Sequence, residues 1–239
     1  MEQFQDRPEL AIYESAKFIV EADAHRALAN IQKDQYSAVV NNPPIDTLVI
    51  DIDWKQKVNL PMGPSETSGG YYNRTQVAMM SVGFYWQGSK GRQNRVVDVI
   101  SATVSETSHC SVAGLKEAFN LLRDQGADGL DILAFKNIDV WADAGSHFRS
   151  YEFLYFMLIG IPTIFPGVLC TINCLIGKHG KNLRDQHFRV IRGYLDRASR
   201  TTHIRTATDL NACLTKTHLT VQSRNRSQGK KINELTFTS

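Results

Sequence analysis

Four aspartates stand at positions that suit metal-dependent phosphodiester chemistry. Asp51 and Asp53 alternate in the stretch VIDIDW, Asp143 follows in VWADAG, and Asp185 follows in NLRDQH. Cleaving a phosphodiester without a covalent enzyme intermediate requires an activated oxygen nucleophile and a neutralised leaving oxygen, and two divalent cations provide both. Mg²⁺, and Mn²⁺ as its substitute, prefer carboxylate oxygens. We therefore expect Asp53, Asp143 and Asp185 to be catalytic metal ligands, with Asp51 as a deeper, supporting ligand.

Basic side chains crowd around Asp185 in the stretch GKHGKNLRDQHFR. Lysine and arginine bind phosphate groups whatever the base sequence. A role in binding nucleic acid is therefore predicted for Lys178, His179, Lys181, Arg184 and Arg189. The alternative is a solvated basic helix face, with Phe188, Ile191 and Leu195 as its buried stripe.

Each acid also has a simpler explanation when taken alone. An aspartate in a strand usually lies at a surface or turn, and one in the first turn of a helix is favoured by the helix dipole. The metal site is favoured because all three acids fall where one sheet would bring them together. His147, His179 and His187 lie close to these acids in the sequence. They could position water or a phosphate, but they are not predicted to be metal ligands.

The composition indicates one large domain with appendages. The chain has 239 residues, of which 42% are hydrophobic, and a net charge of only +3. Global charge is therefore a weak argument for nucleic acid. Residues 153–177 carry no charge and are long enough to span a bilayer. Because two glycines and two prolines interrupt them, we expect a helix end, a turn and a buried strand, with a membrane anchor as an alternative.

The periodicity of the chain predicts three regions. Residues 1–44 form an N-terminal helical arm that ends at the proline pair of NNPP. Residues 45–221 form the main domain, and residues 222–239 form a polar, flexible tail. Within the main domain we expect strands over 47–54, 75–86, 95–105 and 130–143 and within 163–176, and helices over 112–127, 148–159 and 183–198.

Three strands, a helix, a strand, a helix, a strand and a helix follow one another in the ribonuclease H order. We therefore expect an α/β fold with a ribonuclease H-like, mixed five-stranded sheet flanked by helices. In that topology the first and fourth strands are neighbours at the sheet centre. Asp53 and Asp143 would then meet, and the last helix would bring Asp185 across them.

Three segments resemble the motifs of integrase-like catalytic domains from eukaryotic transposon-derived proteins. The first is Asp53-Trp54, followed after a loop by Tyr72-Asn-Arg-Thr-Gln-Val77. The family's SDGAxxxFKN motif corresponds to residues 142–150, and its HGKGxxD motif corresponds to residues 179–185. The similarity covers roughly residues 45–200, and the third motif is the most specific because its spacing is preserved.

The resemblance implies a ribonuclease H-like fold with a three-carboxylate Mg²⁺ site that hydrolyses or transfers DNA strands, acting in the nucleus. The sequence does not distinguish DNA from RNA as the partner. Such enzymes usually act as multimers, so a homo-oligomer is an open alternative to a monomer. The chain departs from the family pattern at Gln56, Lys57 and Ala144. The alternative function is therefore an inactive, domesticated domain that binds nucleic acid or a protein partner.

Overall fold

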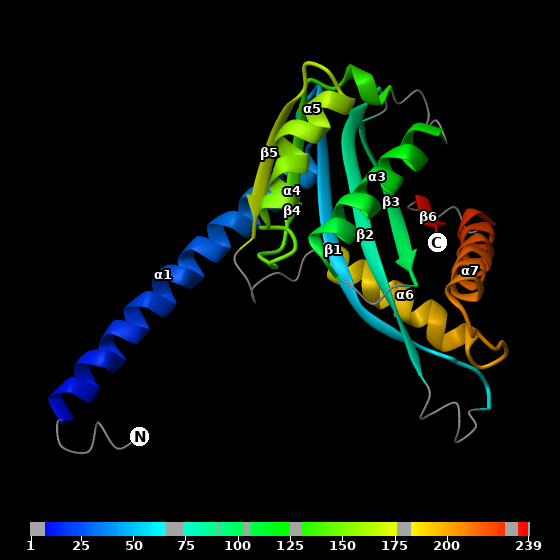
Figure 1. The fold of residues 1–239 in the computed structure, drawn as a ribbon, viewed down its shortest axis with the longest axis horizontal. Coiled ribbons are helices and arrows are strands. Elements are labelled where there is room, and N and C mark those ends of the chain that lie inside the picture. The colour runs from blue at the N-terminus through cyan, green and yellow to red at the C-terminus, as the bar shows by residue number, and fades with distance from the viewer. Residues whose placement is uncertain are drawn as a thin grey trace.

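A single mixed sheet forms the centre of the molecule (Figure 1). The computed structural model describes residues 8–65, 74–89, 91–102, 106–124, 131–175, 183–227 and 234–238. The sheet has six strands in the order β5-β4-β1-β2-β3-β6. Their bounds are β1 Thr47–Leu60, β2 Thr75–Gly88, β3 Gly91–Ser101, β4 Asn137–Ala142, β5 Leu169–Cys174 and β6 Glu234–Thr238.

The first three strands form an antiparallel meander, because β2 pairs with both β1 and β3 in antiparallel register. On the other side of β1, strands β4 and β5 continue the sheet in parallel. The parallel pairs are joined through helices, as crossover connections require. Strand β1 is therefore central, with an antiparallel neighbour on one side and a parallel neighbour on the other.

Helices cover both faces of the sheet (Figure 1). The larger apolar cluster lies on one face and joins the sheet to the helices that follow β3 and β4. These are α3 Ser108–Asp124, α4 Tyr151–Tyr155, the π-helical turn η3 Phe156–Gly160 and α5 Ile161–Ile164, with a short 3₁₀ turn, η2, at Ile132–Ala134. The opposite face carries a second cluster with α6 Leu183–Ala198 and α7 Ala207–Ser227.

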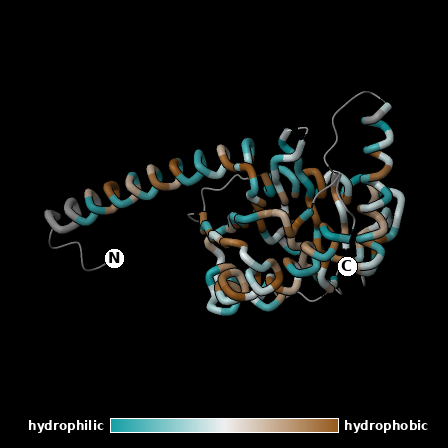
Figure 2. The backbone as a smooth tube through the Cα atoms, turned by 90° about the horizontal axis from the view of Figure 1, so that it is seen from above, coloured by the Kyte–Doolittle hydropathy of each residue, from teal (hydrophilic) through white to brown (hydrophobic). Residues whose placement is uncertain are grey.

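Helix α1, Pro8–Asn41, extends away from the rest of the molecule as a rod (Figures 1 and 2). Only its C-terminal part is anchored. Tyr36 and Val40 are buried against the sheet residues Val49 and Tyr85. Farther out, Phe18 is 72% exposed. The helical arm predicted from the sequence is thus present over its described length.

A change of register in β1 decides which side chains face α6. Up to Ile52, even-numbered residues such as Ile50 point into the cluster under α3, so Asp51 and Asp53 point to the opposite face. The pairing with β2 shifts between Lys55 and Val58. After this irregularity Val58 packs on the α6 side. The bulge therefore lets one strand present polar groups and then apolar groups to the same helix.

The mixed α/β architecture and its flanking helices agree with the prediction, but two details were wrong. The sheet has six strands rather than five, because β6 pairs in parallel with β3. The predicted loose tail from residue 222 is also incorrect for the described residues, since α7 continues to Ser227 and residues 234–238 form β6. Leu235 and Phe237 pack against the α6 cluster, which explains the ordered strand.

The uncharged segment from residue 153 forms α4, η3, α5 and β5 instead of one long helix. None of the helices in the described part of the chain combines the length and the apolar character that crossing a bilayer requires.

Candidate functional site

Asp53, in the middle of β1, and Asp143, the residue after β4, lie where the pairing of these two parallel strands ends. The β1–β4 register pairs Ile52 with Ala142, and each aspartate is the next residue of its chain. Because parallel strands run in step, these two residues emerge side by side at the same edge of the paired region. The predicted neighbourhood of the first and fourth strands is therefore correct.

Asp185 reaches the same place from the first turn of α6. This helix packs against β1. Burial raises the pKa of Asp53 to about 7, and the negative charges of Asp143 and then Asp185 add to the rise. A carboxyl responds in this way only when the other two lie close by in a poorly solvated setting. Three acids from separate parts of the chain thus converge electrostatically on Asp53.

Asp51 does not join this group as a free ligand. It is 2% exposed, and its Oδ1 lies 3.0 Å from Nε of the buried Arg184. The Tyr36 hydroxyl donates a hydrogen bond to Oδ2 of Asp51. Arg184 also donates to Ser81 Oγ, at 3.2 Å. The carboxylate of Asp51 is therefore occupied by a cation of the protein itself, which corrects its prediction as a metal ligand.

The same ion pair corrects the prediction for Arg184. Its side chain is 3% exposed and points into the sheet, so it is not available to a nucleic acid on the surface. Gly83 of β2 makes room for the pair, because a Cβ there would collide with Asp51 Oδ1 and approach Arg184 Nη2 to 2.7 Å. Arg184 is thus an anchor that fixes the start of α6 on the sheet, one residue before Asp185.

A second buried pair anchors α6 one turn later. His187 Nε2 lies 2.7 Å from Oδ2 of Asp98, a fully buried residue of β3. Among the basic residues around Asp185, Arg184 and His187 therefore serve the packing of the helix. Arg189 is exposed, as a nucleic-acid contact requires. Lys178, His179 and Lys181 lie outside the described residues.

The turn after β4 brings His147 close to Asp143. Oδ1 of Asp143 accepts the Gly145 backbone N–H at 2.9 Å, and His147 Nε2 lies 3.9 Å from the same oxygen. Among the described residues, this buried nitrogen has no hydrogen-bond partner. Burial lowers the pKa of His147, while the charges of Asp143 and Glu106 partly oppose this. The sequence did not predict His147 as a site residue, although its spacing of four from Asp143 was a signal.

The side chains of the site suit a hard divalent cation chemically, but they are not yet arranged to coordinate one. Carboxylate oxygens suit Mg²⁺ and Mn²⁺, and the mutual repulsion around Asp53 is what a cation would relieve. The unpartnered, buried His147 nitrogen adds a polar group beside Asp143. Within the described ranges, however, no three His, Cys, Asp or Glu side chains are already placed to hold a metal ion. Binding would require the carboxyls to draw closer.

Comparisons with known proteins leave the family open. No protein-family model matches the chain, and no curated protein matches it. Among solved structures, the chain is similar to one described as the crystal structure of NurA, with 10% identity and a TM-score of 0.18. That alignment covers 93% of this chain, which spans 42% of the other. A similarity this low carries no argument about fold or activity.

Proposed function

We propose that this chain is a metal-dependent DNA nuclease or strand-transfer domain of the ribonuclease H-like class. Its proposed catalytic residues and metal ligands are Asp53, Asp143 and Asp185. The observation that carries the proposal is the β1–β4 register, which places Asp53 beside Asp143. The raised pKa of Asp53 supports it, because the charges of Asp143 and Asp185 add to the effect of burial. Acids with raised pKa values that lie near one another cluster at functional sites.

The sheet supports the ribonuclease H-like assignment. Five of the strands lie in the order β3, β2, β1, β4 and β5. Of these five, only β2 runs antiparallel to the others. This is the arrangement expected from the order of elements in the sequence. The additional strand β6 lies at the far edge, next to β3 and away from the three acids.

The residues divide the work as follows. A bound Mg²⁺ pair would activate the attacking oxygen and neutralise the leaving oxygen. Asp53 and Asp143, on adjacent strands, would hold the cations from the sheet, and Asp185 would complete the set from α6. Because Asp53 has a pKa of about 7, it carries a proton in a large fraction of molecules at neutral pH. Cation binding therefore displaces this proton and becomes stronger as the pH rises.

A plasmid-nicking assay with and without Mg²⁺ tests the activity. Asp53→Asn, Asp143→Asn and Asp185→Asn should each abolish nicking while the protein stays folded. Asp124→Asn is a matched control, because Asp124 is a 65% exposed acid at the end of α3 and should retain full activity. Titration calorimetry with Mn²⁺ should show binding to the parent chain and the control, and loss of binding in the three variants. Retained nicking in Asp53→Asn and Asp143→Asn would refute the assignment.

The alternative is a catalytically inactive domain that binds nucleic acid or a protein partner. Arg189 is exposed on α6, as binding of nucleic acid without cleavage would require. It predicts binding to DNA that does not depend on metal and no nicking at any Mg²⁺ or Mn²⁺ concentration. For a chain that cuts or binds DNA, we propose a nuclear location.

A further inference from the structure

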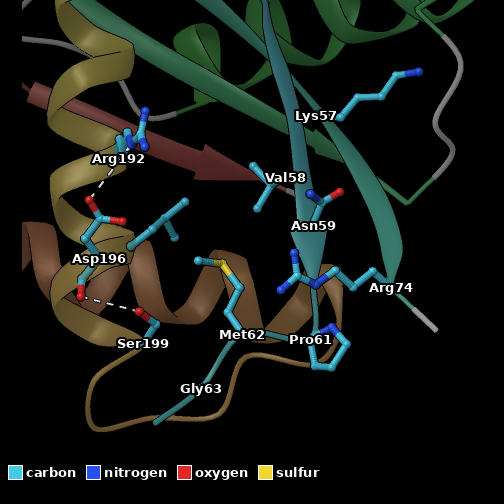
Figure 3. Close-up of a pocket in the computed structure, with 11 residues that line it drawn as sticks. Lys57, Val58, Asn59, Pro61, Met62, Gly63, Arg74, Arg192, Asp196 and Ser199 are labelled. Atoms are coloured by element: carbon cyan, nitrogen blue, oxygen red, sulfur yellow. Dashed lines mark hydrogen bonds and ion pairs between the residues drawn. The ribbon is translucent and has the colours of Figure 1, made fainter. Parts of the chain in front are cut away.

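A cavity of about 460 Å³ lies between α6 and the last residues of β1 (Figure 3). Its walls carry three cations, Lys57, Arg74 and Arg192, and one acid, Asp196. Val58 and Leu195 contribute apolar surface. In Figure 3 Arg192 and Asp196 project from α6 and Arg74 extends toward the cavity from the start of β2, whereas the Lys57 side chain extends away from the other labelled residues. The excess of positive charge makes the cavity suited to anions.

The cavity lies farther along α6 than the proposed active site. Asp185, Arg189, Arg192 and Asp196 follow one another at intervals of four, three and four residues, so they share one face of α6. With a rise of 1.5 Å per residue, Arg192 lies about 10 Å along the helix from Asp185. This distance is about three base steps of a DNA strand at 3.4 Å per step.

Within the cavity, the pairing between Arg192 and Asp196 is weak. Arg192 Nε and Asp196 Oδ2 are 4.0 Å apart, with the side chains 80% and 60% exposed. An exposed pair at this separation contributes little, so the guanidinium can turn to a phosphate at small cost. The negative charge of Asp196 then weakens the binding of anions in the cavity.

We propose that this cavity binds phosphate groups of the DNA strand about three nucleotides from the bond to be cut. The inference rests on the proposed function, because it takes the scissile phosphate to lie at Asp53, Asp143 and Asp185. Arg74 and Arg192 contact the phosphates. Such contacts set the register of the strand without reading its sequence.

Binding of a fluorescently labelled DNA duplex, measured by anisotropy in EDTA, tests the cavity apart from catalysis. Arg192→Gln should weaken binding and reduce the slope of log affinity against log salt by about one. The affinity ratio between parent and variant should shrink about threefold between about 50 and 200 mM salt. Arg197→Gln is the matched control, since Arg197 is an exposed arginine of α6 that lines a different cavity. It should leave the slope unchanged.

Asp196→Asn should change the affinity for DNA in the opposite direction, so this test does not depend on a loss of binding. Removing this acid should tighten DNA binding, which misfolding cannot imitate. Equal effects of Arg192→Gln and Arg197→Gln, or no gain with Asp196→Asn, would overturn the inference. Failure of the proposed function is distinguishable, because a chain that shows these binding changes but never nicks DNA keeps the phosphate site and loses only the catalytic proposal.

Discussion

Replacing Asp53 with asparagine should stabilise the protein at neutral and higher pH. The pKa of Asp53 is raised to about 7 from its ordinary 3.8, because burial and the neighbouring acids disfavour its charged form. Between about pH 4 and 7 the unfolded chain releases this proton while the folded chain keeps it. The stability of the parent protein therefore falls across this range relative to Asp53→Asn, which has no proton to lose.

The size of the effect follows from the shift in pKa. Each tenfold change in proton affinity corresponds to about 1.4 kcal/mol, so the charged side chain lowers the free energy of unfolding by at most about 4 kcal/mol above pH 7. Asp53 is only partly buried, and solvent reduces this figure. We expect Asp53→Asn to exceed the parent by about 2 kcal/mol at pH 8, and to differ little from it below pH 4.

Urea unfolding in EDTA at pH 5, 6, 7 and 8 measures this difference, with Asp124→Asn as the control. Adding Mg²⁺ should then stabilise the parent and leave Asp53→Asn unchanged, because a ligand that binds only the folded state adds about 2.7 kcal/mol at a hundred times its Kd. A difference between Asp53→Asn and the parent that stays constant from pH 5 to 8 would show that the three acids do not interact as described.

Three further changes test the packing around the site by urea unfolding. Arg184→Met should destabilise the fold by about 3–5 kcal/mol, because it leaves the Asp51 carboxylate buried without its cation. The double variant Asp51→Asn/Arg184→Met should recover much of this loss, and a simple sum of the two single effects would contradict the pairing. Gly83→Ala should also destabilise, since the added Cβ collides with the same ion pair, and an unchanged unfolding midpoint would count against that crowding. Phe237→Ala should cost about 1–3 kcal/mol by removing a partly buried ring of β6, whereas a negligible loss would mean that β6 contributes nothing to stability.

The strands and α6 were predictable because their sequences repeat the periods of buried elements. Residues 183–198 form α6 as expected, and the predicted neighbourhood of Asp53 and Asp143 follows from element order alone. The position of α6 against β1 is consistent with the prediction that Asp185 approaches them. These features depend on local periodicity and chain connection, both of which are present in the sequence.

The roles of individual charged residues were harder to predict from the sequence. Arg184 stands four residues before Phe188, so it extends the helix's inward stripe by one turn, but an arginine there is ordinarily taken as exposed. Its burial depends on Asp51 and Gly83, which are distant in the sequence. The strand β6 was missed for a similar reason, because the alternation of Leu235 and Phe237 is short and stands in a polar context. The register shift in β1 has no local sequence signal at all.

Two adjacent residues of α6 have separate roles: Arg184 stabilises the fold, and Asp185 belongs to the proposed metal site. Arg184 faces inward and holds the helix in place, whereas the negative charge of Asp185 helps to raise the pKa of Asp53. A mutation of Asp185 can therefore remove the proposed metal ligand while Arg184 still holds the helix on the sheet. Related chains that retain the arginine but have lost the aspartate would be stable scaffolds, open to recruitment for tasks other than cutting DNA.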